Sequence, residues 1–216
     1  MVITLYYAPV TCAMVSWIML NEVHAEFQTI DLNFRKKDHR KTEYLTINPL
    51  HKVPALVVNE KVLTENVAII QWINATFPNE VVLPTNPWEH FKAISLLSWC
   101  SSGIHPFLTR MNNPKKIVGG SDNTDSVIQI ATTEINECLQ VADIMLGKKE
   151  FFFNNFSAVD VHFFWCCRRA TQFGIALKRF RNVQRHFHFI SQRQSVKKLL
   201  HYEASVIQKF ETSQKA

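Results

Sequence analysis

The segment Asn48-Pro49-Leu50-His51-Lys52-Val53-Pro54-Ala55-Leu56 decides the fold, because it places a proline at the entrance of a predicted β-hairpin. A proline is tolerated in a sheet only at an edge or at the start of a strand, and the Val53–Pro54 bond at this corner is a candidate cis peptide. A cis bond would turn the N–H and C=O of Val53 outward, where an extended peptide ligand could pair with them. The alternative is a trans proline that simply opens a strand, and the frequencies of X–Pro bonds favour it.

Around this segment, the first 80 residues alternate short apolar runs with helical patterns, which is typical of an α/β unit. Strands are predicted at residues 2–6 and 27–32, a hairpin at 54–63, and helices at 12–23, 42–47 and 65–76. No glycine precedes Gly103, so the hairpin turn must use Asn59, the residue there that best tolerates positive φ.

A proline-rich segment separates this unit from a helical remainder. Residues 78–87 have no periodicity, so we predict a linker there between domains at 1–77 and 88–216. Helices are predicted at residues 88–111, 124–146, 157–173, 179–193 and 195–209. Ser157 and Asp160 match an N-cap and its N3 partner, a structural signal for a helix start. The expected fold class is therefore an α/β domain followed by an all-α domain.

The composition describes a folded chain whose cysteines are thiols. The 216 residues are 47% hydrophobic, enough for a sizeable core. No signal-peptide pattern and no apolar run long enough to cross a membrane is present, so we expect the chain in the cytoplasm. The five cysteines have no Cys-x-x-Cys or zinc-finger spacing, which argues against a disulfide framework or a structural zinc site.

Four side chains near the first predicted strand could handle a nucleophile: Tyr6, Tyr7, Thr11 and Cys12. Cys12 lies where this strand should pass into the first helix. A thiol at the positive end of a helix has its pKa lowered from about 8.5 to about 3.5–7.5. The sequence therefore predicts a reactive thiol at Cys12, and the alternative is a small buried hydrophobic residue, which describes most free cysteines.

A second candidate site lies at the start of the helix predicted at 65–76. The free backbone N–H groups of a helix start favour an anionic group, whereas the carboxylate of Glu65 would hold a cationic group beside it. Asn66 adds an amide at the same place. An α-amino acid zwitterion offers both charges at that separation. The alternative is an ordinary helix start with an acidic residue that complements the dipole.

Together, these segments resemble the glutathione transferase family. Residues 48–56 match its cis-proline motif of the form N-P-x-x-x-V-P-A-L, residues 64–69 match the motif that opens its third helix, and residues 156–160 match its helix-capping box. The resemblance covers essentially the whole chain and implies a thioredoxin-like first domain, an all-helical second domain, and glutathione as co-substrate without a metal. Cys12 at the helix start and a histidine at position 105 are most similar to the bacterial beta class.

The resemblance implies an enzyme that conjugates glutathione to electrophiles or catalyses glutathione-dependent thiol–disulfide exchange. Cys12 would face the glutathione sulfur, with His105 near the thiol. Tyr6 is the alternative residue for activating that thiol. The implied contacts to glutathione are Lys52, Val53, Pro54, Glu65, Asn66 and Ser102. The implied partners are a small electrophilic or disulfide substrate and a second copy in a homodimer. Neither a membrane nor nucleic acid is expected.

The chain departs from the family at several positions. Asn66 replaces a common serine, Gly103 and Pro106 replace polar neighbours of the histidine, and Arg169 alters an Arg-Trp pair. Residues 168–198 carry nine Lys and Arg and no Asp or Glu. Such a stretch can attract an anionic partner, so the alternative function is a transferase-fold binding or regulatory module.

Overall fold

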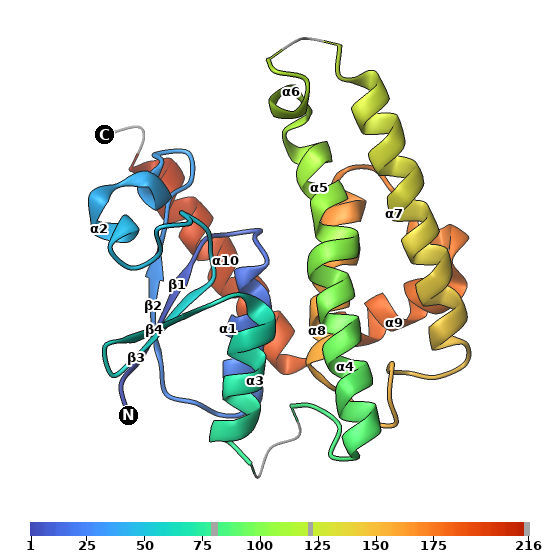
Figure 1. Cartoon of the computed structure of the whole chain (residues 1–216), viewed down its shortest axis with the longest axis horizontal. Helices are drawn as coiled ribbons and strands as arrows, with labels where there is room; N and C mark the ends of the chain where they lie inside the picture. The colour runs from blue at the N-terminus through green and yellow to red at the C-terminus, as the bar shows by residue number, and fades with distance from the viewer. Residues whose placement is uncertain (79–81, 121–122, 214–216) are drawn as a thin grey trace. The chain divides into compact units, whose positions relative to one another are not determined.

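The computed structural model describes residues 1–78, 82–120 and 123–213, which form two compact units (Figure 1). The first unit comprises Met1–Val82 and Gln192–Ala216, and the second comprises Leu83–Ser191. The predicted linker at 78–87 spans this boundary, and its residues 79–81 lie outside the described residues. None of the described helices is long and apolar enough to cross a membrane.

A four-stranded mixed sheet forms the centre of the first unit, in the order β2-β1-β3-β4. The strands are β1 (Ile3–Tyr7), β2 (Gln28–Asp31), β3 (Ala55–Val58) and β4 (Lys61–Thr64). β1 and β2 are parallel because a helix crosses over between them, whereas β3 and β4 form the predicted antiparallel hairpin. In the antiparallel pairing of β3 with β1, Ala55 lies opposite Tyr6, so the Val53–Pro54 corner comes to the carboxyl end of β1.

The helices of the first unit pack against this sheet. They are α1 (Ala13–Glu22), α2 (Thr42–Leu45) after a 3₁₀ turn (Asp38–Arg40), α3 (Asn66–Thr76) and α10 (Gln194–Thr212). Residues 13–20 of α1 are all buried, as expected of a helix that is apolar on every side. α1 therefore belongs to the core of the first unit.

The structure groups α10 with the sheet rather than with the other helices of the predicted second domain. Figure 1 shows α10 running alongside α1. The Tyr202 ring stacks on Trp17 with centroids 5.4 Å apart, and its hydroxyl donates to Asp31 Oδ1 at 2.7 Å. Arg193 forms an ion pair with Glu22 at 2.6 Å. Contacts between residues more than 170 positions apart thus fix the last helix to the first unit.

All secondary-structure elements among the described residues of the second unit are helices. Its elements are α4 (Pro87–Trp99), η2 (Cys100–Ile104), α5 (His105–Asn112), α6 (Pro114–Ile117), α7 (Asp125–Leu146), α8 (Ala158–Gln172), η3 (Leu177–Arg179) and α9 (Arg181–Ser191). α8 is the most buried of these helices and lies at the centre of the unit, in contact with α4, α5 and α9.

The single helix predicted at 88–111 is interrupted in the structure. Cys100–Ile104 is a π-helical segment between α4 and α5, and Pro106 follows it. Pro106 has no N–H to donate to the preceding turn, so the local backbone cannot continue as a regular α-helix. Gly103 is required here, because a Cβ at this position would lie 2.5 Å from Cδ1 of Trp99.

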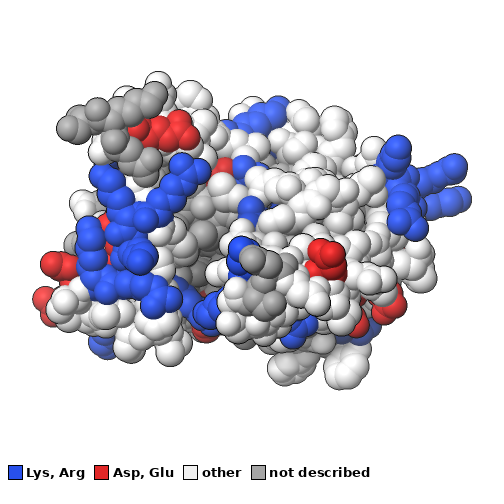
Figure 2. Space-filling model, turned by 90° about the horizontal axis from the view of Figure 1, so that it is seen from above, with Lys and Arg blue, Asp and Glu red and all other residues white. Residues whose placement is uncertain are grey.

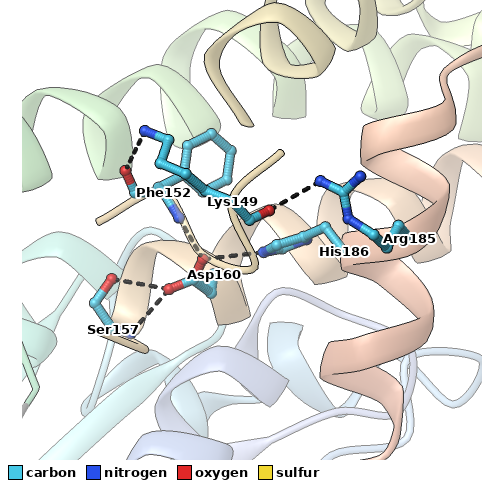
Figure 3. Close-up of polar contacts among 6 residues, drawn as sticks. All are labelled: Lys149, Phe152, Ser157, Asp160, Arg185 and His186. Carbon is cyan, nitrogen blue, oxygen red and sulfur yellow. Dashed lines mark hydrogen bonds and ion pairs between the residues drawn. The ribbon is translucent and has the colours of Figure 1, made fainter. Parts of the chain in front are cut away.

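The predicted capping box at the start of α8 is present (Figure 3). Asp160 Oδ2 accepts hydrogen bonds from the Ser157 backbone N–H at 2.8 Å and from its hydroxyl at 3.1 Å. Asp160 Oδ1 accepts from the Phe152 N–H at 3.1 Å and lies 3.0 Å from Nε2 of His186. Asp160 and His186 are fully buried, so this carboxylate stabilises the unit through partners on both sides of the helix start.

Candidate functional site

The corner before β3 is held by side chains that sequence analysis did not single out. The Lys52 carbonyl accepts hydrogen bonds from the buried Tyr44 hydroxyl and, at 2.8 Å, from Asn48 Nδ2. The Val53–Pro54 bond that follows is cis, as the proline motif predicted and against the trans alternative. Two side chains from the preceding segment thus hold the backbone of this corner, while the Lys52 side chain is exposed.

Val53 and Cys12 meet at this corner. The Cys12 Sγ donates to the Val53 carbonyl at 3.5 Å. The Val53 N–H has no hydrogen-bond partner among the described residues, although Val53 is only 7% exposed. Buried backbone N–H groups are almost always paired. This unpaired donor therefore marks a position where a ligand carbonyl can bind.

Cys12 is the N-cap residue of α1 and is half-buried. Burial of the sulfur raises the pKa of Cys12 to about 12, and the negative charge of Glu65 acts in the same direction. The positive charge of Lys52 and a hydrogen bond from Asn66 oppose this rise without cancelling it. The expectation of a lowered pKa was wrong, because loss of hydration outweighs the helix start.

Asn66, the first residue of α3, braces Cys12 from the other side. Its Nδ2 donates to the Cys12 carbonyl at 3.0 Å, and its Oδ1 accepts from the Ser16 hydroxyl at 2.8 Å. Asn66 and Ser16 are both buried. The amide therefore ties the starts of α1 and α3 together, a role that the sequence did not indicate.

Glu65 precedes Asn66 and has a strained backbone. Its φ is +68°, a value that L-residues rarely adopt, and its side chain is exposed. Such strain persists only where the surrounding structure enforces it, and it is common at ligand sites. The exposed carboxylate lies at the start of α3, next to backbone N–H groups that the helix leaves unpaired.

Two of the other candidates for a nucleophile-handling role, Tyr7 and Thr11, have hydroxyls that donate hydrogen bonds within the first unit. The Tyr7 hydroxyl is buried and donates to Glu203 Oε2 at 2.9 Å, so its proton is not available to a thiolate. The Thr11 hydroxyl donates to the Ala8 carbonyl at 2.7 Å. Tyr6 is half-buried and contacts Tyr44, with ring centroids 5.3 Å apart.

Glu203 is the residue that sequence analysis missed most clearly. This carboxylate on α10 is 2% exposed and accepts from the Val10 N–H at 2.6 Å as well as from Tyr7. Val10 has φ +67° and lies two residues before Cys12. Because 193 positions separate Glu203 from Val10, no local pattern could have revealed the contact.

His105 and Ser102 belong to the second unit. His105 opens α5 and contacts the Trp165 indole, with ring centroids 4.5 Å apart. The buried His162 is close enough to be influenced by it, and burial together with His105 lowers the pKa of His162 to about 3. Ser102 is exposed and donates to the Ser98 carbonyl at 2.8 Å.

The basic stretch at 168–198 does not form a single free surface. Its cations are divided between the two units at Ser191 and Gln192. Arg185 donates to the carbonyls of Gly147 and Lys149, at 2.6 and 3.0 Å, and so caps the end of α7. Arg193 pairs with Glu22, as described above.

A mixed sheet in this order, with a cis proline facing a thiol at the start of the first helix, defines a thioredoxin-like domain. Residues 1–75 match the family described as "Glutathione S-transferase, N-terminal domain". Over most of its length the chain is also similar to glutathione transferases.

Three proteins illustrate this similarity. The chain is 24% identical to "Glutathione S-transferase GstA" of Escherichia coli O157:H7, over 92% of this chain and 98% of that protein. It is 40% identical to a "Probable maleylacetoacetate isomerase" of Caenorhabditis elegans, over 41% of this chain and 40% of that protein. The structure of a bacterial beta-class transferase from Sphingomonas chungbukensis is 29% identical, covers 93% of this chain and 98% of its own, and has a TM-score of 0.81.

Proposed function

We propose that this protein is a glutathione transferase in which Cys12 holds and polarises the sulfur of glutathione, and that it conjugates glutathione to electrophiles. The observation that carries the proposal is the Cys12 thiol, 3.5 Å from the Val53 carbonyl beside the cis Pro54. The match of residues 1–75 to the N-terminal domain of glutathione transferases supports glutathione as co-substrate. The 29% identity to a beta-class structure supports the resemblance on which the role of Cys12 rests.

Glutathione would bind as an extra strand. Its cysteinyl unit would pair with the free N–H of Val53, which brings the ligand sulfur to Cys12. Glu65 would hold the α-amino group of the γ-glutamyl unit, and the first N–H groups of α3 would hold its carboxylate. Asn66 would act on the ligand indirectly, because its side chain positions Cys12.

The raised pKa of Cys12 favours conjugation over thiol exchange. A thiol with a pKa near 12 is protonated at neutral pH, so it can donate a hydrogen bond to the glutathione thiolate but is a poor nucleophile. In conjugation, the glutathione thiolate attacks the electrophile and the leaving group departs. Thiol exchange would require Cys12 to lose its proton, attack a disulfide sulfur and release one glutathione thiolate.

Steady-state conjugation of glutathione to an activated chloronitrobenzene tests this proposal. We expect Cys12→Ala to lower kcat/KM by about tenfold or more, the size of a lost transition-state hydrogen bond. Cys138→Ala is the matched control, because Cys138 is also half-buried but lies in the second unit. Equal rates for Cys12→Ala and the unmodified protein would remove Cys12 from the mechanism.

Mass spectrometry after incubation with oxidised glutathione tests the exchange reaction separately. A single adduct that Cys12→Ala abolishes would place thiol exchange at this residue. An adduct that survives the substitution would assign it to another cysteine.

The match to a maleylacetoacetate isomerase supports a second candidate function. The same bound thiolate could add to a conjugated double bond, allow rotation and leave, which isomerises the substrate without consuming glutathione. An unsaturated cis-diketo acid followed by ultraviolet absorbance would detect this activity, with free thiol titrated in parallel. Loss of thiol during the reaction would instead indicate conjugation.

The binding-module alternative rests on the basic stretch at 168–198. Several of its cations are engaged in contacts within their own unit, which weakens the case for a nucleic-acid surface. We expect retention of the protein on immobilised glutathione. Failure there, together with salt-dependent retention on heparin, would favour the binding module.

The family also supports a homodimer. Large apolar side chains are more than half exposed on two helices of the second unit, at Trp88 and Phe91 of α4 and at Ile130 and Ile144 of α7. Exposed apolar surface of this kind marks interaction sites. Light scattering after size-exclusion chromatography should give a dimer mass for the protein and a monomer mass for a Phe91→Glu, Ile144→Glu variant.

A further inference from the structure

Exposed cations come together where α7 ends and α9 begins, in the second unit, and we call them the α9 basic patch. The patch consists of Lys148, Lys178, Arg179, Arg181 and Arg185, all exposed. Figure 2 shows Lys and Arg side chains that project from the side of this unit on which α7 and α9 lie in Figure 1. The side chains stand out from a convex edge and do not line a groove.

Hydrogen bonds between α7 and α9 hold the segments of the patch in place. Asp143 Oδ1 accepts from the N–H groups of Asn182 and Val183, at 2.7 and 3.0 Å, and so caps the start of α9. The bonds that Arg185 donates to two carbonyls after α7, described above, hold the next turn of α9. The start of α9 therefore lies beside the segment that carries Lys148.

The positive charge of the patch is largely uncompensated. Apart from Arg185, the side chains of the patch form no hydrogen bond or ion pair with residues 1–78, 82–120 and 123–213. The acceptors of Arg185 are neutral carbonyl and amide oxygens. Residues 161–202 include no Asp or Glu, and of the two acidic residues that flank Lys148 in sequence, Asp143 caps α9 and Glu150 is exposed. A patch of this kind attracts a surface of opposite charge.

An exposed aromatic side chain lies on the same face of α9 as two of these cations. Arg181, Arg185 and Phe189 are spaced by four residues, so they follow one stripe of the helix. Phe189 is 39% exposed, whereas Val183 and Ile190 are buried. A double-stranded nucleic acid offers phosphates but no apolar layer for such a ring. The boundary between lipid headgroups and acyl chains accepts both the cations and the ring.

We propose that the exposed face of α9 and the α9 basic patch bind the surface of an anionic lipid bilayer, with the cations at the headgroup phosphates and Phe189 at the acyl boundary. Each Lys or Arg near such a surface strengthens binding by about fivefold. The whole patch would therefore favour an anionic over a neutral bilayer by a factor on the order of 10³. Association of this kind requires no membrane-spanning helix, and it does not depend on the transferase reaction.

Co-sedimentation of the full chain with vesicles tests this surface. We expect binding to vesicles of phosphatidylcholine mixed with phosphatidylglycerol, little binding to phosphatidylcholine alone, and a loss of binding as salt screens the charges. The double variant Arg179→Gln, Arg181→Gln should lower the partition coefficient by about 30-fold. Lys92→Gln, Lys116→Gln is the matched control, because both lysines are exposed in the same unit but lie outside the patch, and it should bind as the unmodified protein does.

A second variant separates a bilayer from a soluble polyanion. Phe189→Ser should weaken binding to the mixed vesicles by about tenfold, because its ring would no longer leave water, and should leave any binding to double-stranded DNA unchanged. Circular dichroism would verify that each variant is folded. Binding to DNA but not to vesicles, equal binding to both kinds of vesicle, an unaffected Phe189→Ser variant, or equal losses in the arginine and lysine double variants would each overturn the proposal. A protein that binds the mixed vesicles but lacks transferase activity would contradict only the proposed function.

Discussion

The starts of α8 and α1 are built in opposite ways. α8 begins with a capping box in which every acceptor of a buried carboxylate is used, and its central partners Ser157 and Asp160 are three residues apart. α1 begins at Cys12 with no side-chain cap, and the residues that contact this cysteine come from two distant segments, at Val53 and at Asn66. The polar groups at the start of α8 satisfy one another, so this start serves stability. At the start of α1, the Val53 N–H and the Cys12 thiol remain available to a ligand.

The largest expected loss of stability comes from disrupting the capping box at the start of α8. Asp160→Ala removes the acceptor for Ser157, Phe152 and His186 at once. Loss of one member of such a buried polar network costs about 3–5 kcal/mol. We expect a fall of this size in the free energy of unfolding, measured by urea denaturation.

Asp125→Ala provides the comparison, because Asp125 is an exposed acidic residue in the first turn of α7. It should cost about 0.3–1 kcal/mol, the usual contribution of an acidic residue at an exposed helix start. Similar losses for the two variants would mean that the α8 network adds nothing beyond a simple dipole effect.

The next largest loss of stability is expected when Glu203, which fixes the loop before α1, is replaced. Glu203→Gln replaces a buried carboxylate that accepts from Tyr7 and Val10 with an amide, which presents a donor to one of them. We expect a loss of about 2–3 kcal/mol in unfolding free energy, typical of hydrogen bonds to a buried charge. Because the Val10 loop leads into Cys12, transferase kcat should fall as well.

Tyr7→Phe removes only one of these two contacts and leaves the carboxylate bound to Val10. It should cost about 1 kcal/mol and leave kcat nearly unchanged. If both variants lowered stability and kcat in the same proportion, Glu203 would be a packing residue with no specific role in positioning the loop.

A smaller loss is expected for Asn66→Ala, which leaves the Cys12 carbonyl and the Ser16 hydroxyl without their partner. About 1–2 kcal/mol should be lost in urea denaturation. Ser16→Ala, which keeps the bond from Asn66 to Cys12, should retain the peptide-mapped rate of Cys12 alkylation, whereas Asn66→Ala should change it. Identical alkylation rates would show that Asn66 does not position Cys12.

The same contrast explains what the sequence could predict. The strands, the hairpin at 54–63 and the capping box depend on neighbours in sequence, and the structure confirms all three. The role of Glu203 and the grouping of α10 with the sheet depend on contacts across almost the whole chain. The pKa of Cys12 was mispredicted because a sequence reveals a helix start but not the enclosure of a sulfur atom.

The smallest expected effect is a change in the pKa of Cys12 caused by one nearby charge. Because the carboxylate of Glu65 raises the pKa of Cys12, Glu65→Gln should lower this pKa and increase the thiolate fraction at a given pH. We expect alkylation of Cys12 by iodoacetamide at pH 9 to become about threefold faster, which corresponds to about half a pKa unit for one exposed charge. Peptide mapping by mass spectrometry would resolve Cys12 from the other cysteines.

Glu60→Gln is the matched control, because Glu60 is exposed in the β3-β4 turn and does not act on the pKa of Cys12. In the unmodified protein the rate should still rise between pH 9 and 11, where a free cysteine with a pKa near 8.5 has already levelled off. A rate that levels off below pH 8 would mean that the helix start prevails over burial after all. Cys12 would then be a thiolate at neutral pH, and thiol exchange would replace conjugation as the favoured reaction.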